Sequence, residues 1–265
     1  MKRQQSSPSE EPRQYCALVT GASSGIGQAI AEQLLTEGHR VIALARREER
    51  LQALKHHPGA ESGLHIATAD VRDKNAMRSV LDALPVEFSE IDVLINNAGL
   101  ALGIAPAQES QFDDWQTMID TNCTALAWLS RELLPAMLAR SRGHIVNMGS
   151  IAGRYPYRGS SVYGASKAFV EQFSLNLRAD LLGTPIRCTL IEPGMVGNSE
   201  FSLVRMAGDE AAAAAVYAGA EELTPESVAS AVSYVINQPA HVNVNRIELM
   251  PVCQAADSIG VSRSR

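Results

Sequence analysis

The sequence lacks the features that would mark a membrane protein, a metalloenzyme or a nucleic-acid binder. None of its 265 residues lies in an apolar run that approaches the roughly 20 residues of a membrane-spanning helix. Its 23 Lys and Arg residues are outnumbered by 29 Asp and Glu residues, and this net charge of −6 argues against broad neutralisation of nucleic-acid phosphates. The six histidines show no His-Glu-x-x-His and no regular ligand spacing, so we predict no metal site.

Cysteine is also scarce. The four cysteines are scattered along the chain without a Cys-x-x-Cys pair, and we interpret them as buried thiols in a reducing compartment: Cys16, Cys123, Cys188 and Cys253. Residues 1–14 are polar and have no apolar centre, which favours a disordered tail over a secretory signal. We therefore expect a cytoplasmic protein.

The chain alternates between short apolar runs and helical patterns, which predicts a doubly wound parallel sheet in a single α/β domain. We expect the domain to span residues 15–252, with a mobile flap at 195–223 and a C-terminal tail at 253–265. Expected strands are 15–20, 40–45, 64–69, 91–95, 144–148, 186–191 and 246–250. Expected helices are 28–37, 48–57, one from near Asn75, 112–140, 163–182 and 224–237, the last with Thr224 as N-cap and Pro225 at its first position.

A glycine-rich turn joins the first strand to the first helix. Such a turn lets the backbone approach a phosphate closely, and the free N–H groups at the helix start favour an anion. The spacing is Gly-x-x-x-Gly-x-Gly, which differs from the commoner Gly-x-Gly-x-x-Gly, and an ordinary strand-to-helix turn is the alternative. The candidate cofactor-binding residues here are Gly21, Ser23, Ser24, Gly25, Ile26 and Gly27.

The second strand ends without the acidic residue that often holds the adenosine ribose. It ends instead at Ala45, followed by Arg46 and Arg47. Two guanidinium groups and no carboxylate suit a 2′-phosphate, which favours NADP over NAD. The alternative is that the two arginines only begin a solvated helix.

Two further strand ends carry candidate cofactor contacts. Asp70 and Val71 follow the third strand, where they would meet the adenine edge, although Asp70 could instead cap the next helix. Small and amide residues follow the fourth strand and suit a floor beneath a cofactor, although a plain turn uses the same types: Asn96, Asn97, Ala98 and Gly99.

Three residues suit proton transfer at an alcohol oxygen. Tyr163 and Lys167 are four apart and share a helix face, and Ser150 follows the strand before them. A phenol with a pKa of about 10 is too weakly acidic to serve as a base at neutral pH, and a nearby cation lowers that value. We therefore expect Lys167 to lower the pKa of Tyr163, and Ser150 to hold the substrate oxygen. Taken without the other motifs, the Tyr-x-x-x-Lys spacing has an alternative interpretation, which is an exposed helix face without a catalytic role.

These motifs, in this order and spacing, resemble the short-chain dehydrogenase/reductase family over about residues 15–250. The resemblance rests on the glycine turn, Asn96 to Gly99, Asn122, Ser150, Tyr163, Lys167 and Pro193-Gly194. It implies a Rossmann-type fold with a seven-stranded sheet, with Tyr163 as acid/base and Lys167 also holding the nicotinamide ribose. It further implies that Asn122 anchors a water linking Lys167 to solvent, and that the cofactor is bound by Pro193, Gly194 and Val196.

Longer strings are similar to the branch of NADP-dependent 3-hydroxy acid dehydrogenases. They include residues 97–103, 162–170, 191–197 and 239–245. The resemblance implies oxidation of serine, L-allo-threonine and 3-hydroxy acids, and reduction of malonic semialdehyde. The chain departs from the branch in its N-terminal tail, its Ser23-Ser24-Gly25-Ile26 turn and its last eleven residues, which leaves the fine substrate preference open.

Two other functions are possible for such a chain: a short-chain reductase of 3-oxoacyl thioesters or other carbonyls, or a non-catalytic NADP-binding regulator. No basic cluster stands out to receive an acidic thioester carrier, and all four catalytic residue types are present. For a small hydroxy acid we hypothesise that Arg205, in the flap, clamps the carboxylate, with Arg154 as runner-up. The resemblance also implies a homotetramer in which segments 112–140 and 163–182 pair across a two-fold axis.

Overall fold

A seven-stranded, all-parallel sheet forms the centre of the protein. We analysed a computed structural model, in which residues 14–256 are described. The strand order is β3-β2-β1-β4-β5-β6-β7. The strands are β1 (Cys16–Thr20), β2 (Arg40–Ala45), β3 (Leu64–Thr68), β4 (Val93–Asn96), β5 (His144–Met148), β6 (Arg187–Pro193) and β7 (Arg246–Leu249). All seven predicted strands are present, each within two residues of its expected bounds, so the predicted fold class is confirmed.

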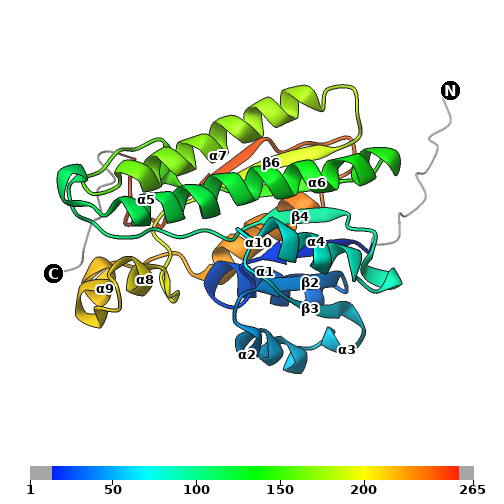
Figure 1. The fold of residues 1–265 in the computed structure, drawn as a ribbon, viewed down its shortest axis with the longest axis horizontal. Helices are drawn as coiled ribbons and strands as arrows, with labels where there is room; N and C mark the ends of the chain where they lie inside the picture. The colour runs from blue at the N-terminus through cyan, green and yellow to red at the C-terminus, as the bar shows by residue number, and fades with distance from the viewer. Residues whose placement is uncertain (1–13, 257–265) are drawn as a thin grey trace, which may run out of the picture.

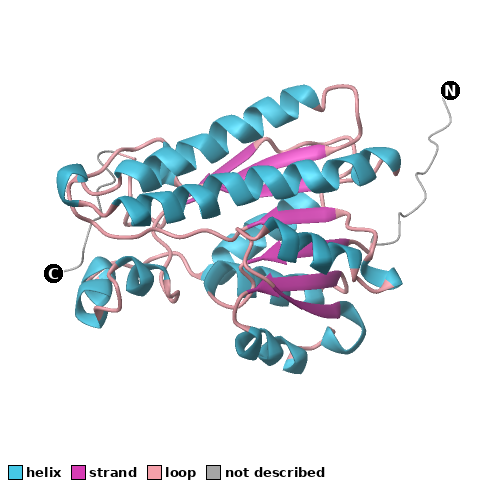
Figure 2. Ribbon diagram, viewed as in Figure 1, coloured by secondary structure: helices cyan, strands magenta, loops and turns pink. Residues whose placement is uncertain are grey.

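Helices cover both faces of this sheet (Figures 1 and 2). On one face α1 (Gly25–Thr36) and α10 (Pro225–Ile236) pack beside each other over an apolar cluster that includes Ile30 and Val232. On the other face α4 (Lys74–Asp82), α6 (Leu126–Ala139) and α7 (Ser161–Asp180) cover a second cluster that includes Met77 and Leu129. The inner strands are buried on both sides, which explains their nearly continuous apolar sequences.

The order of the strands reverses between β1 and β4, which are neighbours in the sheet although two strands separate them in the chain. Chain crossovers therefore leave this point in opposite directions. In open α/β sheets a crevice forms there, outside the carboxyl ends of the strands. The glycine turn after β1 and the Asn97-Ala98-Gly99 segment after β4 both lie at this end.

The predicted long helix at 112–140 is interrupted in the structure. It consists of α5 (Phe112–Ile119), a π-helical stretch η4 (Asp120–Ala125) and α6. π-Helical turns widen the hydrogen-bond ladder and are frequently found at functional sites. The interruption contains Asn122, which the sequence already marks as a poor helix former.

Other helices differ from prediction mainly at their ends. α1 starts at Gly25 within the glycine turn, and the helix expected at 48–57 divides into α2 (Glu48–Leu51) and the 3₁₀ turn η1 (Gln52–His56). Thr224 caps α10 as predicted, in a reciprocal capping box with Ser227. The remaining short elements are α3 (Ala60–Gly63), η2 (Val86–Phe88), η3 (Ala107–Glu109) and η5 (Ile151–Gly153).

The segment expected as a flap leaves the sheet after β6. It holds two short helices, α8 (Phe201–Arg205) and α9 (Glu210–Tyr217), and it is closed by a bridge between Val196 and Leu223. In Figure 1 these helices stand apart from the sheet, at the lower left. The predicted tails lie largely outside the described residues. Within residues 14–256, no helix is long and apolar enough to cross a membrane.

Candidate active site

A cavity of about 720 Å³ opens at the carboxyl end of the sheet. Its wall combines the glycine turn, the ends of β2 to β6 and the flap. Nearly all predicted site residues line it: Gly21, Ser23, Ser24, Gly25, Ile26, Gly27, Arg46, Arg47, Asp70, Val71, Asn97, Ala98, Gly99, Ser150, Tyr163, Lys167, Pro193, Gly194, Val196 and Arg205. The structure therefore brings together residues that are up to 184 positions apart in the chain.

The glycine turn is held against the segment after β4. The Thr20 hydroxyl donates to the Ile95 carbonyl (3.1 Å) and accepts from the backbone N–H groups of Asn97 (3.1 Å) and Ala98 (3.0 Å). The Asn97 amide donates back to the Thr20 carbonyl (2.9 Å). A side chain at Gly27 would lie 2.3 Å from the Gly21 carbonyl oxygen, so only glycine lets these segments pack this closely.

One end of the cavity is rich in arginine. The Arg47 guanidinium contacts the hydroxyls of Ser23 (3.3 Å) and Ser24 (3.1 Å) and the carboxylate of Glu200 (2.8 Å). Arg46 is largely exposed, beside Asp70. Both predicted arginines therefore lie where an anion could bind, next to the turn expected to hold phosphate.

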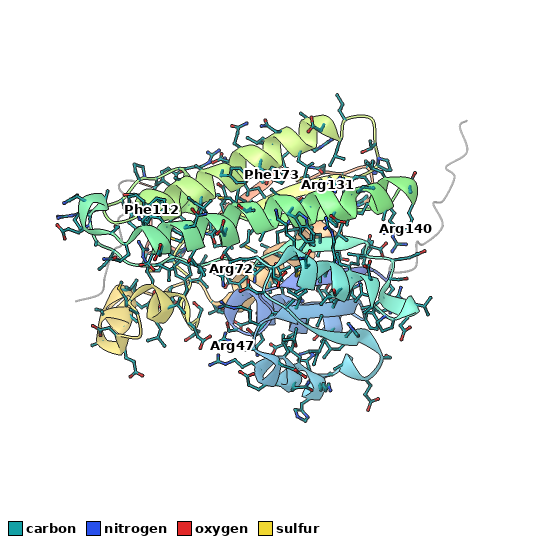
Figure 3. The ribbon with its side chains drawn as sticks, in the orientation of Figure 1. Arg47, Arg72, Phe112, Arg131, Arg140 and Phe173 are labelled. Atoms are coloured by element: carbon teal, nitrogen blue, oxygen red, sulfur yellow. The ribbon has the colours of Figure 1, made fainter. Side chains whose placement is uncertain are left out.

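Asp70 is not the cap of the following helix, so that alternative is wrong. Asp73 caps α4 and accepts from the backbone N–H groups of Asn75 and Ala76, because Asp73 directly precedes the helix. Asp70 instead receives a two-point hydrogen bond from Arg72 (2.7 and 3.0 Å), which lowers the pKa of its carboxyl. Arg47 and Arg72 lie at the same end of the sheet (Figure 3).

At the other end of the cavity Tyr163 lies beside Ser150. The tyrosine is buried, and burial raises the pKa of its phenol well above the ordinary value, although a hydrogen bond with Ser150 and the positive charge of Arg205 lower it. The sequence-based expectation of a lowered pKa is thus wrong for the protein by itself. The physical reason is that desolvation of the phenolate outweighs the nearby positive charge.

Lys167 is buried beneath the same tyrosine. Its ammonium group donates to the Met148 carbonyl (2.9 Å) and lies 5.9 Å from the centre of the Tyr163 ring. Burial lowers the pKa of Lys167 from 10.5 to about 8. The predicted sharing of one helix face is confirmed, since both side chains reach the cavity from α7.

Asn122 is buried and does not line the cavity. Its amide accepts from the backbone N–H of Leu100 (2.9 Å) and donates to the Leu100 carbonyl (2.9 Å) and the Ser166 hydroxyl (3.0 Å). Its oxygen also lies near Gly99, on the side of that glycine that faces Lys167. Asn122 therefore fixes the loop after β4 against α7.

Arg205, the last residue of α8, reaches the end of the cavity where Tyr163 lies. It donates to the Tyr157 hydroxyl (2.7 Å) and to the carbonyls of Gly103 (3.2 Å) and Gly159 (3.1 Å). Its guanidinium carbon lies 5.7 Å from the centre of the Tyr163 ring. Arg154, the runner-up, lies elsewhere, paired with Glu171 and Glu192, because the loop after β5 turns it away from the cavity.

Several polar residues of the cavity were not predicted from the sequence, among them Arg72, Tyr157, Glu200 and Gln254. Arg72 follows Asp70 by two positions, so a search for basic residues near strand ends could have found it. Gln254 lies in the stretch expected as a tail, yet its side chain accepts from the backbone N–H of Met195 (2.8 Å). No local pattern marks Glu200 or Gln254. Among the described residues, no group of His, Cys, Asp and Glu could hold a metal ion.

The fold and this arrangement of residues are those of a short-chain dehydrogenase. Residues 15–205 match the family described as short chain dehydrogenase, and the chain belongs to that family. It is 52% identical over 246 residues to the NADP-dependent 3-hydroxy acid dehydrogenase of Escherichia coli (strain K12), covering 93% of this chain and 98% of that protein.

A further relative and a solved structure are similar over nearly their whole length. The chain is 48% identical to sulfoacetaldehyde reductase 2 of Chromohalobacter salexigens, covering 93% of this chain and 98% of that protein. A solved structure described as the closed form of serine dehydrogenase complexed with NADP⁺ aligns with a TM-score of 0.89 and 52% identity, covering 94% of this chain and 99% of that one.

Proposed function

We propose that the protein is an NADP-dependent oxidoreductase that moves a hydride between the nicotinamide and the 3-hydroxyl carbon of small 3-hydroxy acids or β-hydroxy amino acids. The observation that carries this is one cavity that has Ser150 and the buried pair Tyr163 and Lys167 at one end, and arginines at the other. The names of the relatives agree with this class of reaction. The experiment is absorbance at 340 nm with NADP and serine, L-allo-threonine or 3-hydroxypropionate, and with NADPH and malonic semialdehyde.

The cavity fits NADP by its own chemistry. The glycine turn leaves its backbone open to the cavity, and a side chain at Gly99 would approach the Lys167 ammonium to 3.4 Å. Arg46 and Arg47 would hold the 2′-phosphate, and Ser23 and Ser24 lie beside them. Val71 and Asp70 would border the adenine, and Ala98, Gly99, Pro193, Gly194 and Val196 would border the nicotinamide half. When bound, NADP supplies or accepts the hydride.

Tyr163 is the proton carrier. Because burial raises the pKa of its phenol, the group is protonated at neutral pH and is ready to donate a proton to a carbonyl oxygen during reduction. In the direction of oxidation the phenol must lose that proton, and the positive charges of Lys167 and Arg205 favour the phenolate. Ser150 would hold the same substrate oxygen from the other side.

Lys167 has a second task, which is to bind the nicotinamide ribose through its remaining N–H donors. One of its N–H donors is already used by the Met148 carbonyl (2.9 Å). Asn122 holds the Leu100 backbone and supports the floor on which these groups rest. Its proposed role of anchoring a water for proton exchange with solvent fits its position near Gly99.

Arg205 would clamp the substrate carboxylate. Three of its five N–H groups are directed at Tyr157, Gly103 and Gly159, which leaves two for an anion. A guanidinium pairs with a planar carboxylate at two points. A small sulfonate carries the same charge and is the second candidate, because the chain also resembles a sulfoacetaldehyde reductase.

We further propose a homotetramer that works in the cytoplasm. Apolar side chains remain exposed along α5, α6 and α7, where a partner copy would cover them: Phe112, Ile119, Leu138, Phe169 and Leu175. Figure 3 labels Phe112 on α5 and Phe173 on α7. All four cysteines are free thiols, which supports a reducing compartment.

Replacing Arg46 and Arg47 together by glutamine removes the charge that we assign to the 2′-phosphate. The Michaelis constant for NADP should rise at least tenfold (~1.4 kcal/mol), while that for NAD should change little. Steady-state kinetics with both cofactors measures this. Equal changes for NADP and NAD would show that the arginines do not read the phosphate.

Tyr163→Phe removes the phenolic proton and keeps the ring. Turnover should fall by at least the ~10²-fold typical of a lost general acid or base, while NADP still binds. We therefore expect this fall in turnover together with an unchanged dissociation constant for NADP. Activity within a few-fold of the wild type would refute the assignment.

Arg205→Met should weaken use of serine or 3-hydroxypropionate by about one to two orders of magnitude, at ~1.4 kcal/mol per tenfold. An uncharged alcohol of similar size is the control and should be affected little. If both substrates lose the same factor, Arg205 only shapes the flap. The panel should include a small hydroxy sulfonate to separate the two candidate anions.

Light scattering at micromolar concentration should give the mass of a tetramer. Replacing Phe112 and Phe169 by serine should reduce that mass, because these exposed rings lie on the helices proposed to pair. A monomer in the unmodified protein would contradict this assembly.

A further inference from the structure

Glu200, an acidic residue of the flap, already pairs with Arg47, one of the two arginines proposed to bind the 2′-phosphate. Glu200 accepts from Arg47 through one carboxylate oxygen (2.8 Å) and pairs with Arg50 through the other (2.8 Å). These two contacts lower the pKa of Glu200, so the carboxylate is charged at neutral pH. The carboxylate thus lies between two guanidinium groups, as a bound anion would.

This contact crosses from the flap to the cofactor half of the cavity. Glu200 immediately precedes α8, and its neighbour Ser199 lies 3.0 Å from where a Gly25 side chain would begin. The flap therefore passes directly over the glycine turn. Gly25, Arg47, Ser199 and Glu200 all line the cavity, whereas Arg50 does not.

The hydrogen bonds of the Arg47 guanidinium are concentrated on one of its nitrogen atoms. One terminal nitrogen, Nη2, serves Glu200, Ser23 and Ser24, which is more acceptors than its two N–H groups can fully satisfy. A phosphate that binds at Nη2 must replace either the carboxylate or a serine hydroxyl, and in the second case it lies next to the carboxylate. A phosphate that binds at another edge of the same guanidinium still lies within a few ångströms of a negative charge, which repels it.

We propose that Glu200 is a specificity-determining residue that competes with the 2′-phosphate of NADP for Arg47. Glu200 then lowers the affinity for the phosphorylated cofactor and leaves the affinity for NAD unchanged. This rests on the proposed function, in which Arg47 holds that phosphate. The flap would then sense which cofactor is bound, because the 2′-phosphate and the flap residue Glu200 share one arginine.

In the opposite role, Glu200 would help NADP to bind by holding Arg47 in place. Ser23 and Ser24 already contact the same nitrogen, so Arg47 keeps two partners without Glu200. Removing the carboxylate also leaves two positive charges, on Arg47 and Arg50, where the set previously carried one net charge. Competition and charge therefore act in the same direction, and we expect them to outweigh the loss of a fixed side-chain position.

The test is Glu200→Gln, which keeps the shape of the side chain and removes its charge. Binding is measured by calorimetry with NADP and NAD, and with the fragments 2′,5′-ADP and 5′-AMP, which differ only in the 2′-phosphate. We expect NADP and 2′,5′-ADP to bind about tenfold more tightly (~1.4 kcal/mol), with NAD and 5′-AMP within twofold of the wild type.

Glu210→Gln is the matched control, since it makes the same charge change at an exposed position of the same flap. It should leave all four dissociation constants unchanged. Weaker NADP binding in Glu200→Gln would mean that Glu200 positions Arg47, and equal changes for NADP and NAD would mean that it only closes the flap. Either result, or no change, overturns the proposal.

Arg47→Gln separates this inference from the function on which it rests. If Arg47→Gln weakens NADP selectively but Glu200→Gln has no effect, only the competition is wrong. If Arg47→Gln affects NADP and NAD equally, the phosphate site itself is wrongly assigned.

Discussion

The hydroxyl of Thr20 joins the carboxyl ends of the two central strands, and the cavity depends on that junction. It bonds to the backbone on both sides of Asn97, while the Asn97 amide returns to the Thr20 carbonyl. The bond from Thr20 to Ile95 is buried, so water does not compete for it, and the bonds to Asn97 and Ala98 are partly buried. They fix the glycine turn and the floor of the cavity relative to each other, and so set where the two halves of a dinucleotide could lie.

Burial determines the protonation of Tyr163 and Lys167 at the other end of the cavity. Tyr163 and Lys167 both lose water, and the same desolvation acts on them in opposite senses: it raises the pKa of the phenol and lowers that of the ammonium. Both changes favour the uncharged forms. Arg205 adds a positive charge beside the phenol from the flap. The flap therefore contributes to the electrostatics of the catalytic end and, through Glu200, to the cofactor end.

Much of this could be predicted from the sequence because the motifs are local. The glycine turn, the Arg46-Arg47 pair and the Tyr163–Lys167 spacing each depend on a few neighbouring residues, and parallel strands bring their ends together. What could not be predicted depends on long-range packing. The contact between Glu200 and Arg47 joins residues 153 positions apart, and the raised pKa of Tyr163 arises from burial by several elements. The π-helical interruption around Asn122 also reflects tertiary contacts, with Leu100 and Ser166.

In the proposed reaction a hydride passes directly between the nicotinamide and the 3-carbon of a small hydroxy acid. The most direct measurement reduces malonic semialdehyde with NADPH that carries deuterium at both C4 positions of the nicotinamide, followed by mass spectrometry and NMR of the product. We expect one deuterium on the carbinol carbon of 3-hydroxypropionate. A reduced product without deuterium at that carbon, or no reduction of any small 3-oxo acid, would contradict it.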